Sequence, residues 1–367
     1  MEFYDLYRKQ LGHDLDSFLA GITPGEVSDI INKNRITETG FLALLSPAGQ
    51  KMLEPMARKA HGLTVKNFGK VIQLYTPMYL SNHCTNECAY CGFNVRNTLG
   101  RRTLTIGEVE EEGRIITKTG LRHILVLTGE SPRNAPVEYI GKCVRKLRQY
   151  FSSVSIEIYP LHTDEYKTLI EAGVDGLTLY QEVYDPEIYD IVHIRGPKKD
   201  YTFRLNAPER ACRAGMRTVN LGALLGLNDW QKEVFALGLH ARYLQDKYPE
   251  TEISVSFPRI RPAQGGFQPK VTVSDEELVQ MILAVRIFLP RVGITVSTRE
   301  RADFRDNLIR LGVTKMSAGS CTEVGGRLGG EGRDSQFEIS DSRSVPEMRS
   351  TIQKLGYQAV CKDWLTI

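Results

Sequence analysis

From about residue 66 onward, short runs of apolar and β-branched residues alternate with longer amphipathic stretches. The short runs carry few charges, which is the pattern of parallel strands that are buried on both faces. Eight strands are predicted, over Val71–Asn82, His123–Glu130, Val154–Pro160, Gly176–Val183, Thr218–Leu225, Glu252–Pro258, Gly293–Arg299 and Lys315–Cys321.

The stretches between the predicted strands have the periodicity of helices. The clearest one spans Ser274–Pro290, where apolar residues from Leu278 to Val285 recur at i, i+3, i+4 and i+7. Ser274 followed by Glu277 predicts a capping box at its start. Similar patterns predict helices over Pro136–Phe151, Asp164–Ala172, Asn206–Ala214, Trp230–Lys247, Arg301–Leu311 and Pro346–Leu355.

Eight strands that alternate with helices predict an α/β protein with a (β/α)8 barrel of the TIM type. A doubly wound open sheet is the competing interpretation, and the barrel is favoured because the alternation has few breaks. Residues 1–65 predict a helical extension, residues 66–330 the barrel, and residues 331–367 a C-terminal extension that packs on it. Active sites of such barrels lie at the C-terminal ends of the strands.

Three cysteines follow the first predicted strand in a short polar segment. Cys84, Cys88 and Cys91 have the spacing C-x3-C-x2-C, and three thiolates on one loop can bind three irons of a [4Fe–4S] cluster. The fourth iron would then keep an open position, as catalytic metal sites do. A structural zinc site in a non-catalytic scaffold is the alternative, but zinc normally needs a fourth ligand, and the adjacent His83 has poor geometry for it.

The cysteine segment resembles the signature of the radical S-adenosylmethionine (SAM) superfamily, in which an aromatic residue, here Tyr90, precedes the last cysteine. The resemblance implies that the open iron binds the amino and carboxylate groups of SAM. One electron from the cluster would then give methionine and a 5′-deoxyadenosyl radical. The resemblance also implies that Tyr90 packs near the adenine.

The second predicted strand ends in Thr128, Gly129 and Glu130. The resemblance implies that this segment holds the SAM amino group, although the superfamily has a glycine at the position of Thr128. A strand-to-loop turn would explain Gly129 without any ligand.

Acidic and amide side chains on the next two strands are further candidates for SAM binding. Glu157 is flanked by two isoleucines that face the other way, so its side chain must point into the barrel. A buried carboxylate needs a partner, either SAM or a structural arginine. Gln181 and Glu182 end the fourth strand and could serve in the same way.

The later strands end in groups that suit a substrate carboxylate, which arginine can grip bidentately. The candidates are Arg259, Arg261, Arg299, Arg301, Ser317 and Ser320, with Tyr79 near the mouth as a substrate neighbour. Some of these arginines are expected to form structural ion pairs, and Tyr79 could simply pack in its strand. Glu157, Glu182, His240 and Arg299 stay open as groups that move a proton or hold a ligand, with Glu157 and Arg299 as the catalytic candidates.

Several further segments resemble the aromatic amino-acid lyases of this superfamily, and above all the 2-iminoacetate synthase family. The segments are Tyr180–Glu182, Gly222–Leu227, Ser256–Arg259, Ser297–Glu300, Gln336–Asp341 and Lys362–Trp364. The resemblance implies cleavage of the Cα–Cβ bond of L-tyrosine to 2-iminoacetate and 4-methylphenol, for the thiazole of thiamin. Because 2-iminoacetate is unstable in water, it also implies a thiazole synthase partner, together with an electron donor such as flavodoxin or ferredoxin.

Two related activities stay open. The tyrosine lyase that matures [FeFe]-hydrogenase carries further clustered cysteines after the barrel, whereas this chain has only Cys361 after residue 330. That difference favours the thiamin enzyme over the maturase. A tryptophan lyase is the other alternative.

Composition and charge exclude several other classes of protein. The 47 basic and 44 acidic residues leave a net charge of +3, which is too small to indicate a nucleic-acid partner. No apolar run is long enough to span a membrane, and the first residues do not predict a signal peptide. Seven cysteines, three of them within eight residues, do not predict a disulfide framework, and a reducing cytoplasm is expected.

Overall fold

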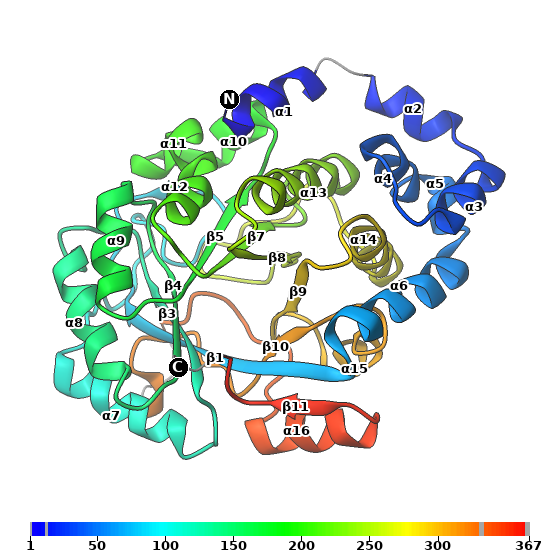
Figure 1. Ribbon diagram of the computed structural model, residues 1–367. Coiled ribbons are helices and arrows are strands. Elements are labelled where there is room, and N and C mark those ends of the chain that lie inside the picture. Colours follow the sequence, from blue (N-terminus) through cyan, green and yellow to red (C-terminus); the bar gives the residue numbers. More distant parts are fainter. Residues whose placement is uncertain (1, 12–13, 330–333, 364–367) are drawn as a thin grey trace.

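The centre of the computed structural model, which describes residues 2–11, 14–329 and 334–363, is a barrel of eight parallel strands (Figure 1). The first strand pairs with the second barrel strand on one side and with the last on the other, so the sheet closes on itself. This closure confirms the (β/α)8 barrel and excludes the open sheet. The barrel strands are β1 (Val71–Ser81), β3 (His123–Thr128), β4 (Ser153–Glu157), β5 (Gly176–Glu182), β7 (Thr218–Ala223), β8 (Glu252–Ser256), β9 (Gly293–Val296) and β10 (Lys315–Ser317).

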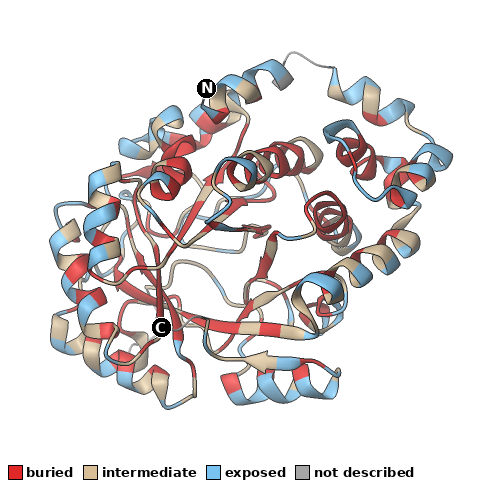
Figure 2. Cartoon of the chain, in the orientation of Figure 1, coloured by how far each residue is buried: buried red, intermediate tan, exposed pale blue. Residues whose placement is uncertain are grey.

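Helices cover the outside of the barrel and bury one face each against it (Figure 2). The helix α14 begins with the predicted capping box, in which Ser274 accepts from the backbone of Glu277. The helices after β1 are α7 (Ile106–Thr117), α8 (Val137–Leu147), α9 (Thr163–Glu171), α10 (Pro186–Val192), α11 (Tyr201–Leu205), α12 (Ala207–Arg213), α13 (Trp230–Lys247), α14 (Asp275–Phe288), α15 (Ala302–Leu308) and α16 (Val345–Lys354). Short 3-10 turns lie at Pro197–Lys199 and Gly326–Leu328.

Helices between Phe3 and Phe68 form an extension ahead of the barrel, and several of them pack on α13 and α14 (Figure 1). The Phe41 ring stacks on Phe288 with centroids 4.5 Å apart, so the extension shares the hydrophobic core of the outer helices. Its helices are α1 (Phe3–Leu11), α2 (Leu15–Gly21), α3 (Pro24–Asn32), α4 (Glu38–Leu44), α5 (Pro47–Gln50) and α6 (Leu53–Phe68).

Three short strands have no counterpart among the predicted elements. β2 (Glu87–Cys88) and β6 (His193–Arg195) form an antiparallel pair beside the cysteine segment. β11 (Gln358–Val360) lies parallel to the start of β1 and attaches the C-terminal segment to the barrel. All three are too short to show a periodic pattern. No helix in the described part of the chain is long and apolar enough to cross a membrane.

Candidate active site

The cysteine segment runs across the C-terminal end of the barrel, directly after β1. Cys88 lies in β2, buried, and its carbonyl accepts from the Asn94 side chain at 2.8 Å. Cys84 and Cys91 are half-buried, and all three thiols are free. Burial raises the pKa of each thiol, to about 11 for Cys84, and the charges of Glu130 and the neighbouring thiols raise the pKa of Cys84 and Cys88 further.

This set of donors fits an iron–sulfur cluster. Three mutually close thiols with raised pKa values become thiolates together only beside a strongly cationic centre, which iron supplies. Among the described residues, no three Cys, His, Asp or Glu side chains are gathered tightly enough to ligate one metal ion. The thiolates of a four-iron cube lie further apart than the ligands of a single zinc ion. The arrangement therefore favours the cluster over the zinc scaffold.

Gly129 is the position where the second barrel strand meets the cysteine segment. Its backbone N–H donates to the Ser81 carbonyl at 2.7 Å. A Cβ at this position would overlap the carbonyl group of His83, which directly precedes the first cysteine. Only glycine permits this approach, so the turn at the end of β3 positions the cysteine segment whether or not it also contacts SAM.

Gly129→Ala is accordingly expected to lower the iron content of the reconstituted protein severalfold, because the added methyl pushes the cysteine segment away from β3. The measurement is iron and sulfide analysis after anaerobic reconstitution. Gly62→Ala is the matched control, since a Cβ at Gly62 in α6 meets no atom within 4 Å. That change should stabilise the protein by about 0.5–1 kcal/mol and leave the iron content unchanged. Equal iron in both variants would refute the positioning role.

A cavity opens beside the cysteine segment at the mouth of the barrel. It brings together many of the predicted site residues: Tyr79, Tyr90, Cys91, Glu157, Glu182, Arg261, Arg299, Ser317 and Ser320 all line it. Thr128, Gly129, Glu130 and Gln181 lie outside this lining. The Gln181 amide and the Thr128 hydroxyl are nonetheless buried without a hydrogen-bond partner in the described structure, as is the Ser320 hydroxyl. Buried polar atoms without partners are typical of a binding site in which the ligand supplies the missing hydrogen bonds.

Two basic residues that the sequence did not single out hold the carboxylates of this region. Arg204 donates to Glu130 at 2.9 Å, and Lys198 donates to Glu182 at 2.8 Å. Burial alone would raise the pKa of Glu130, but Arg204 and Lys198 lower it below its usual value. Both bases come from the segment after β6, whose strand pairing with β2 no sequence pattern reveals.

The backbone of Glu182 is unusual. Its φ of 71° makes it the one non-glycine residue with a positive φ in the described chain. It lies where the register between β5 and β7 shifts. Strain of this kind is kept where it aims a side chain at a functional site, and Glu182 lines the cavity.

Glu157 ends β4 and points into the cavity, as its alternation with isoleucines predicted. No hydrogen bond to its side chain is present in the described structure. Burial, and after it the charge of Glu182, raises the pKa of Glu157 to about 7. The carboxyl therefore changes charge near neutral pH and lacks the partner that a buried acid needs.

The four mouth arginines divide into two pairs. Arg259 is held by Glu300 and Asp275, and Arg301 is half-exposed and paired with Asp275 and Asp303, so neither lines the cavity. Arg299 and Arg261 line it, and within the described structure neither has a carboxylate at ion-pair distance. The Arg299 guanidinium instead lies over the Phe337 ring, 3.5 Å from its centroid. Two arginines therefore remain available to a ligand anion.

The segment around residue 336 completes the site. Gln336 accepts from the Tyr79 hydroxyl at 2.6 Å, and its amide lies 4.0 Å from the Cys91 sulfur. It thus links the first barrel strand to the cysteine segment. His240 lies elsewhere: it is buried in α13, stacks on Phe3 and bonds the Tyr184 hydroxyl at 3.0 Å. The structure gives His240 a packing role away from the cavity.

Comparison with known sequences agrees with this geometry. Residues 78–237 match the radical SAM superfamily, and residues 256–358 match the biotin and thiamin synthesis associated domain. The chain is 37% identical to the 2-iminoacetate synthases of Salmonella typhimurium and Escherichia coli, over 99% of its own length and 96% of theirs.

Solved structures show the same relationship. The [FeFe]-hydrogenase maturase HydG superposes with a TM-score of 0.91 at 32% identity, covering 96% of this chain and 80% of HydG. HydG of Carboxydothermus hydrogenoformans gives 0.85 at 33% identity, covering 91% and 79%. Methylornithine synthase gives 0.72 at 22% identity, covering 91% of this chain and 97% of that one, which shows a shared fold.

Proposed function

Because the chain belongs to the radical SAM superfamily and, within it, to the 2-iminoacetate synthase family, we propose that the mouth cavity is where L-tyrosine is cleaved at its Cα–Cβ bond. The products are 2-iminoacetate, which supplies the thiazole of thiamin, and 4-methylphenol. The observation that carries this assignment is one cavity lined both by Cys91, which we assign to the cluster, and by Arg299, which has no carboxylate partner in the described structure.

The cofactors are a [4Fe–4S] cluster and SAM, which together supply a 5′-deoxyadenosyl radical that takes a hydrogen atom from the tyrosine amino group. Cys84, Cys88 and Cys91 hold the cluster. The Tyr90 side chain lines the cavity next to Cys91, and its hydroxyl is fixed by His193 at 2.8 Å, so its ring is rigid where the adenine would pack.

Glu157 and Glu182 are the carboxylates that we assign to SAM, with Gln181 and Thr128 as unpaired polar groups behind them. The amino group and ribose hydroxyls of SAM are donors, which suits an acidic, hydrogen-bond-accepting wall. Lys198 fixes Glu182 at 2.8 Å, whereas Glu157 has no such partner and is free to accept from the ligand.

The opposite wall suits the amino acid. Arg299 and Arg261 can hold the tyrosine carboxylate, with the Ser320 hydroxyl as an additional donor. Apolar side chains such as Leu224 and Ile260 line the same cavity and can cover the phenol ring. Enclosure of this kind excludes water from the radical and holds the amine in place for hydrogen transfer.

SAM binding is expected to weaken as the pH falls below about 7, because protonation removes the charge with which Glu157 accepts the SAM donors. Above that pH the carboxyl is ionised and the affinity should level off. The measurement is the Kd of SAM from pH 6 to pH 8.5 without reductant. Glu157→Gln should bind roughly tenfold more weakly at pH 8 and lose the pH dependence. A pH profile that survives this substitution would assign the titration to another group.

The partners that the family implies remain part of this proposal. A thiazole synthase would take up 2-iminoacetate before water hydrolyses it, and a flavodoxin or ferredoxin would supply the electron. The segment with Cys88 pairs with β6, whose residues Ile194 and Arg195 are exposed and could contact a donor protein. Exposed apolar residues there include Ile191 and Ile194.

The related lyases make different products, which provides the test between them. The purified, reconstituted enzyme should release 4-methylphenol from tyrosine and leave tryptophan intact, without cyanide or carbon monoxide. Cyanide and carbon monoxide would identify a maturase, and cleavage of tryptophan a tryptophan lyase. The similarity to HydG shows that the maturase is a related family and does not by itself assign the maturase activity to this chain.

A further inference from the structure

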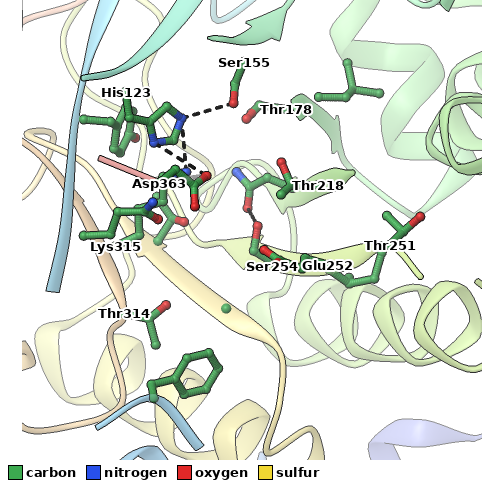
Figure 3. A pocket seen from close by; sticks show the side chains of 18 of the residues that line it. His123, Ser155, Thr178, Thr218, Thr251, Glu252, Ser254, Thr314, Lys315 and Asp363 are labelled. Atoms are coloured by element: carbon green, nitrogen blue, oxygen red, sulfur yellow. Dashed lines mark hydrogen bonds and ion pairs between the residues drawn. The ribbon is translucent and has the colours of Figure 1, made fainter. Parts of the chain in front are cut away.

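A second cavity lies at the other end of the barrel, where the strands begin (Figure 3). At this depth a TIM barrel is usually filled by branched apolar side chains. Here every barrel strand contributes a polar residue instead: Gln73, His123, Ser155, Thr178, Asn220, Ser254, Thr295 and Lys315, which together define the lower chamber. The chamber has a volume of about 460 Å³, enough for a small organic ligand with water.

The lower chamber contains the Lys315 ammonium group and a ring nitrogen of His123 that has no hydrogen-bond partner among the described residues. The Lys315 ammonium lies 3.5 Å from His123 Nε2, which also contacts the Ser155 hydroxyl at 3.1 Å. His123 Nδ1 is buried and has no hydrogen-bond partner among the described residues. Burial, and after it the charge of Lys315, lowers the pKa of His123 far below its usual value, so the ring is neutral. A buried polar atom without a partner, facing a polar cavity, indicates a missing ligand or water.

The chain's own C-terminal segment places a carboxylate in this chamber. β11 leads Asp363 to the chamber wall, where Figure 3 shows it between His123 and Lys315. Its carboxylate lies 2.8 Å from Arg217 and 4.0 Å from His123 Nδ1. Burial disfavours the charge, but the cationic Lys315 and Arg217 keep the pKa of Asp363 below its usual value. The chamber thus stabilises a carboxylate.

We propose that the lower chamber is a second binding site, for a small carboxylate that Lys315 and the surrounding hydroxyl groups hold in the region now occupied by Asp363. Asp363 is an internal competitor for this site. In the described structure its backbone is held by the three-residue strand β11 and by the hydrogen bond that the Arg122 N–H donates to the Cys361 carbonyl, so its withdrawal breaks few backbone contacts besides the ion pair with Arg217.

The position of the chamber indicates which carboxylate it receives. Tyr75 and Leu125 line both the lower chamber and the mouth cavity, so the two cavities adjoin at these side chains. Resting on the proposed function, the ligand is then the two-carbon product 2-iminoacetate, which is a small anion. The apolar 4-methylphenol does not suit a chamber lined by hydroxyl and amide groups.

Oxamate, a stable planar carboxylate that resembles 2-iminoacetate, tests the site. The reconstituted enzyme, saturated with SAM and tyrosine but without reductant, is titrated with oxamate by calorimetry. Lys315→Met should bind oxamate at least about tenfold more weakly, because a charge-assisted hydrogen bond is lost. Asp363→Asn should bind at least about tenfold more tightly, because the competing charge is gone. Lys354→Met, at an exposed lysine of α16, is the matched control and should equal the unmodified enzyme.

The gain of affinity in Asp363→Asn cannot arise from misfolding, so that variant keeps the test decisive if Lys315→Met is unstable. No binding to either the unmodified enzyme or Asp363→Asn would overturn the proposal. Oxamate binding that neither substitution changes would overturn it as well. No turnover takes place in this titration, so such a result would leave the assignment of tyrosine cleavage intact.

Discussion

Replacing Cys88 by alanine is expected to abolish the cluster and to lower SAM cleavage by about a thousandfold or more, because the protein supplies no other route for the electron. Cys88 is the buried member of the three cysteines and lies in β2, whose pairing with β6 fixes the segment. Two remaining thiols cannot hold the cube against oxygen and solvent. Iron content, the visible absorption of the cluster and 5′-deoxyadenosine formation would each report the loss.

Cys143→Ala is the matched control. Cys143 is fully buried in α8, far from the cysteine segment in sequence, and packs in the hydrophobic core. Its removal should cost about 1–2 kcal/mol of unfolding free energy and leave cluster and activity intact. SAM cleavage that persists in Cys88→Ala, or a cluster lost from Cys143→Ala, would contradict the assignment of the ligands.

Arg299→Met is expected to reduce kcat/KM for tyrosine by about 10²–10³-fold, which corresponds to about 3–4 kcal/mol for a charge-assisted, partly buried contact. Arg299 lines the cavity, lies over the Phe337 ring and has no carboxylate partner in the described structure. The substitution keeps an unbranched apolar stem and removes the guanidinium with its charge and its hydrogen-bond donors. Arg299 also lowers the pKa of Glu157, so the Kd of SAM is compared at pH 8.5, where Glu157 is ionised in the unmodified enzyme, and should change far less than kcat/KM.

Arg301→Met separates this effect from a general loss of positive charge at the mouth. Arg301 is two residues further along, its side chain is 55% exposed, and Asp275 and Asp303 already neutralise it. Exposed pairs of this kind contribute about 0–1 kcal/mol, so kcat/KM should stay within roughly threefold. Equal losses in the two variants would show that Arg299 does not hold the substrate.

Much of the fold could be predicted because the signal is local. β1, β3, β5 and β7 begin at the residues where the apolar runs begin, and the capping box of α14 is visible as Ser274 and Glu277. The predicted strands continue past the observed ends, because they include residues of the mouth that directly follow each strand, such as Ser297–Arg299 after β9. β2, β6 and β11 were missed because two or three residues carry no periodicity.

The candidate site could be predicted only in part, for a similar reason. Their spacing identifies Cys84, Cys88 and Cys91 in the sequence, and the alternation with isoleucines identifies Glu157. Whether an arginine is free or paired depends on acids far along the chain, such as Asp275 for Arg259 and Arg301. Lys198, Arg204 and Gln336 reach the site from a 3-10 turn, a five-residue helix and a loop, and no periodic pattern marks segments this short. The positive φ of Glu182 marks it as a special position of the structure. It could not be predicted, because a positive φ is expected from the sequence at glycine and not at glutamate.

The most direct test of the central claim is product analysis after anaerobic reconstitution with iron and sulfide, followed by incubation with SAM, dithionite and tyrosine. We expect 5′-deoxyadenosine together with 4-methylphenol and with glyoxylate, the hydrolysis product of 2-iminoacetate. Formation of 5′-deoxyadenosine without cleaved tyrosine would contradict the substrate assignment. A colourless reconstituted protein that leaves SAM intact would contradict the account as a whole.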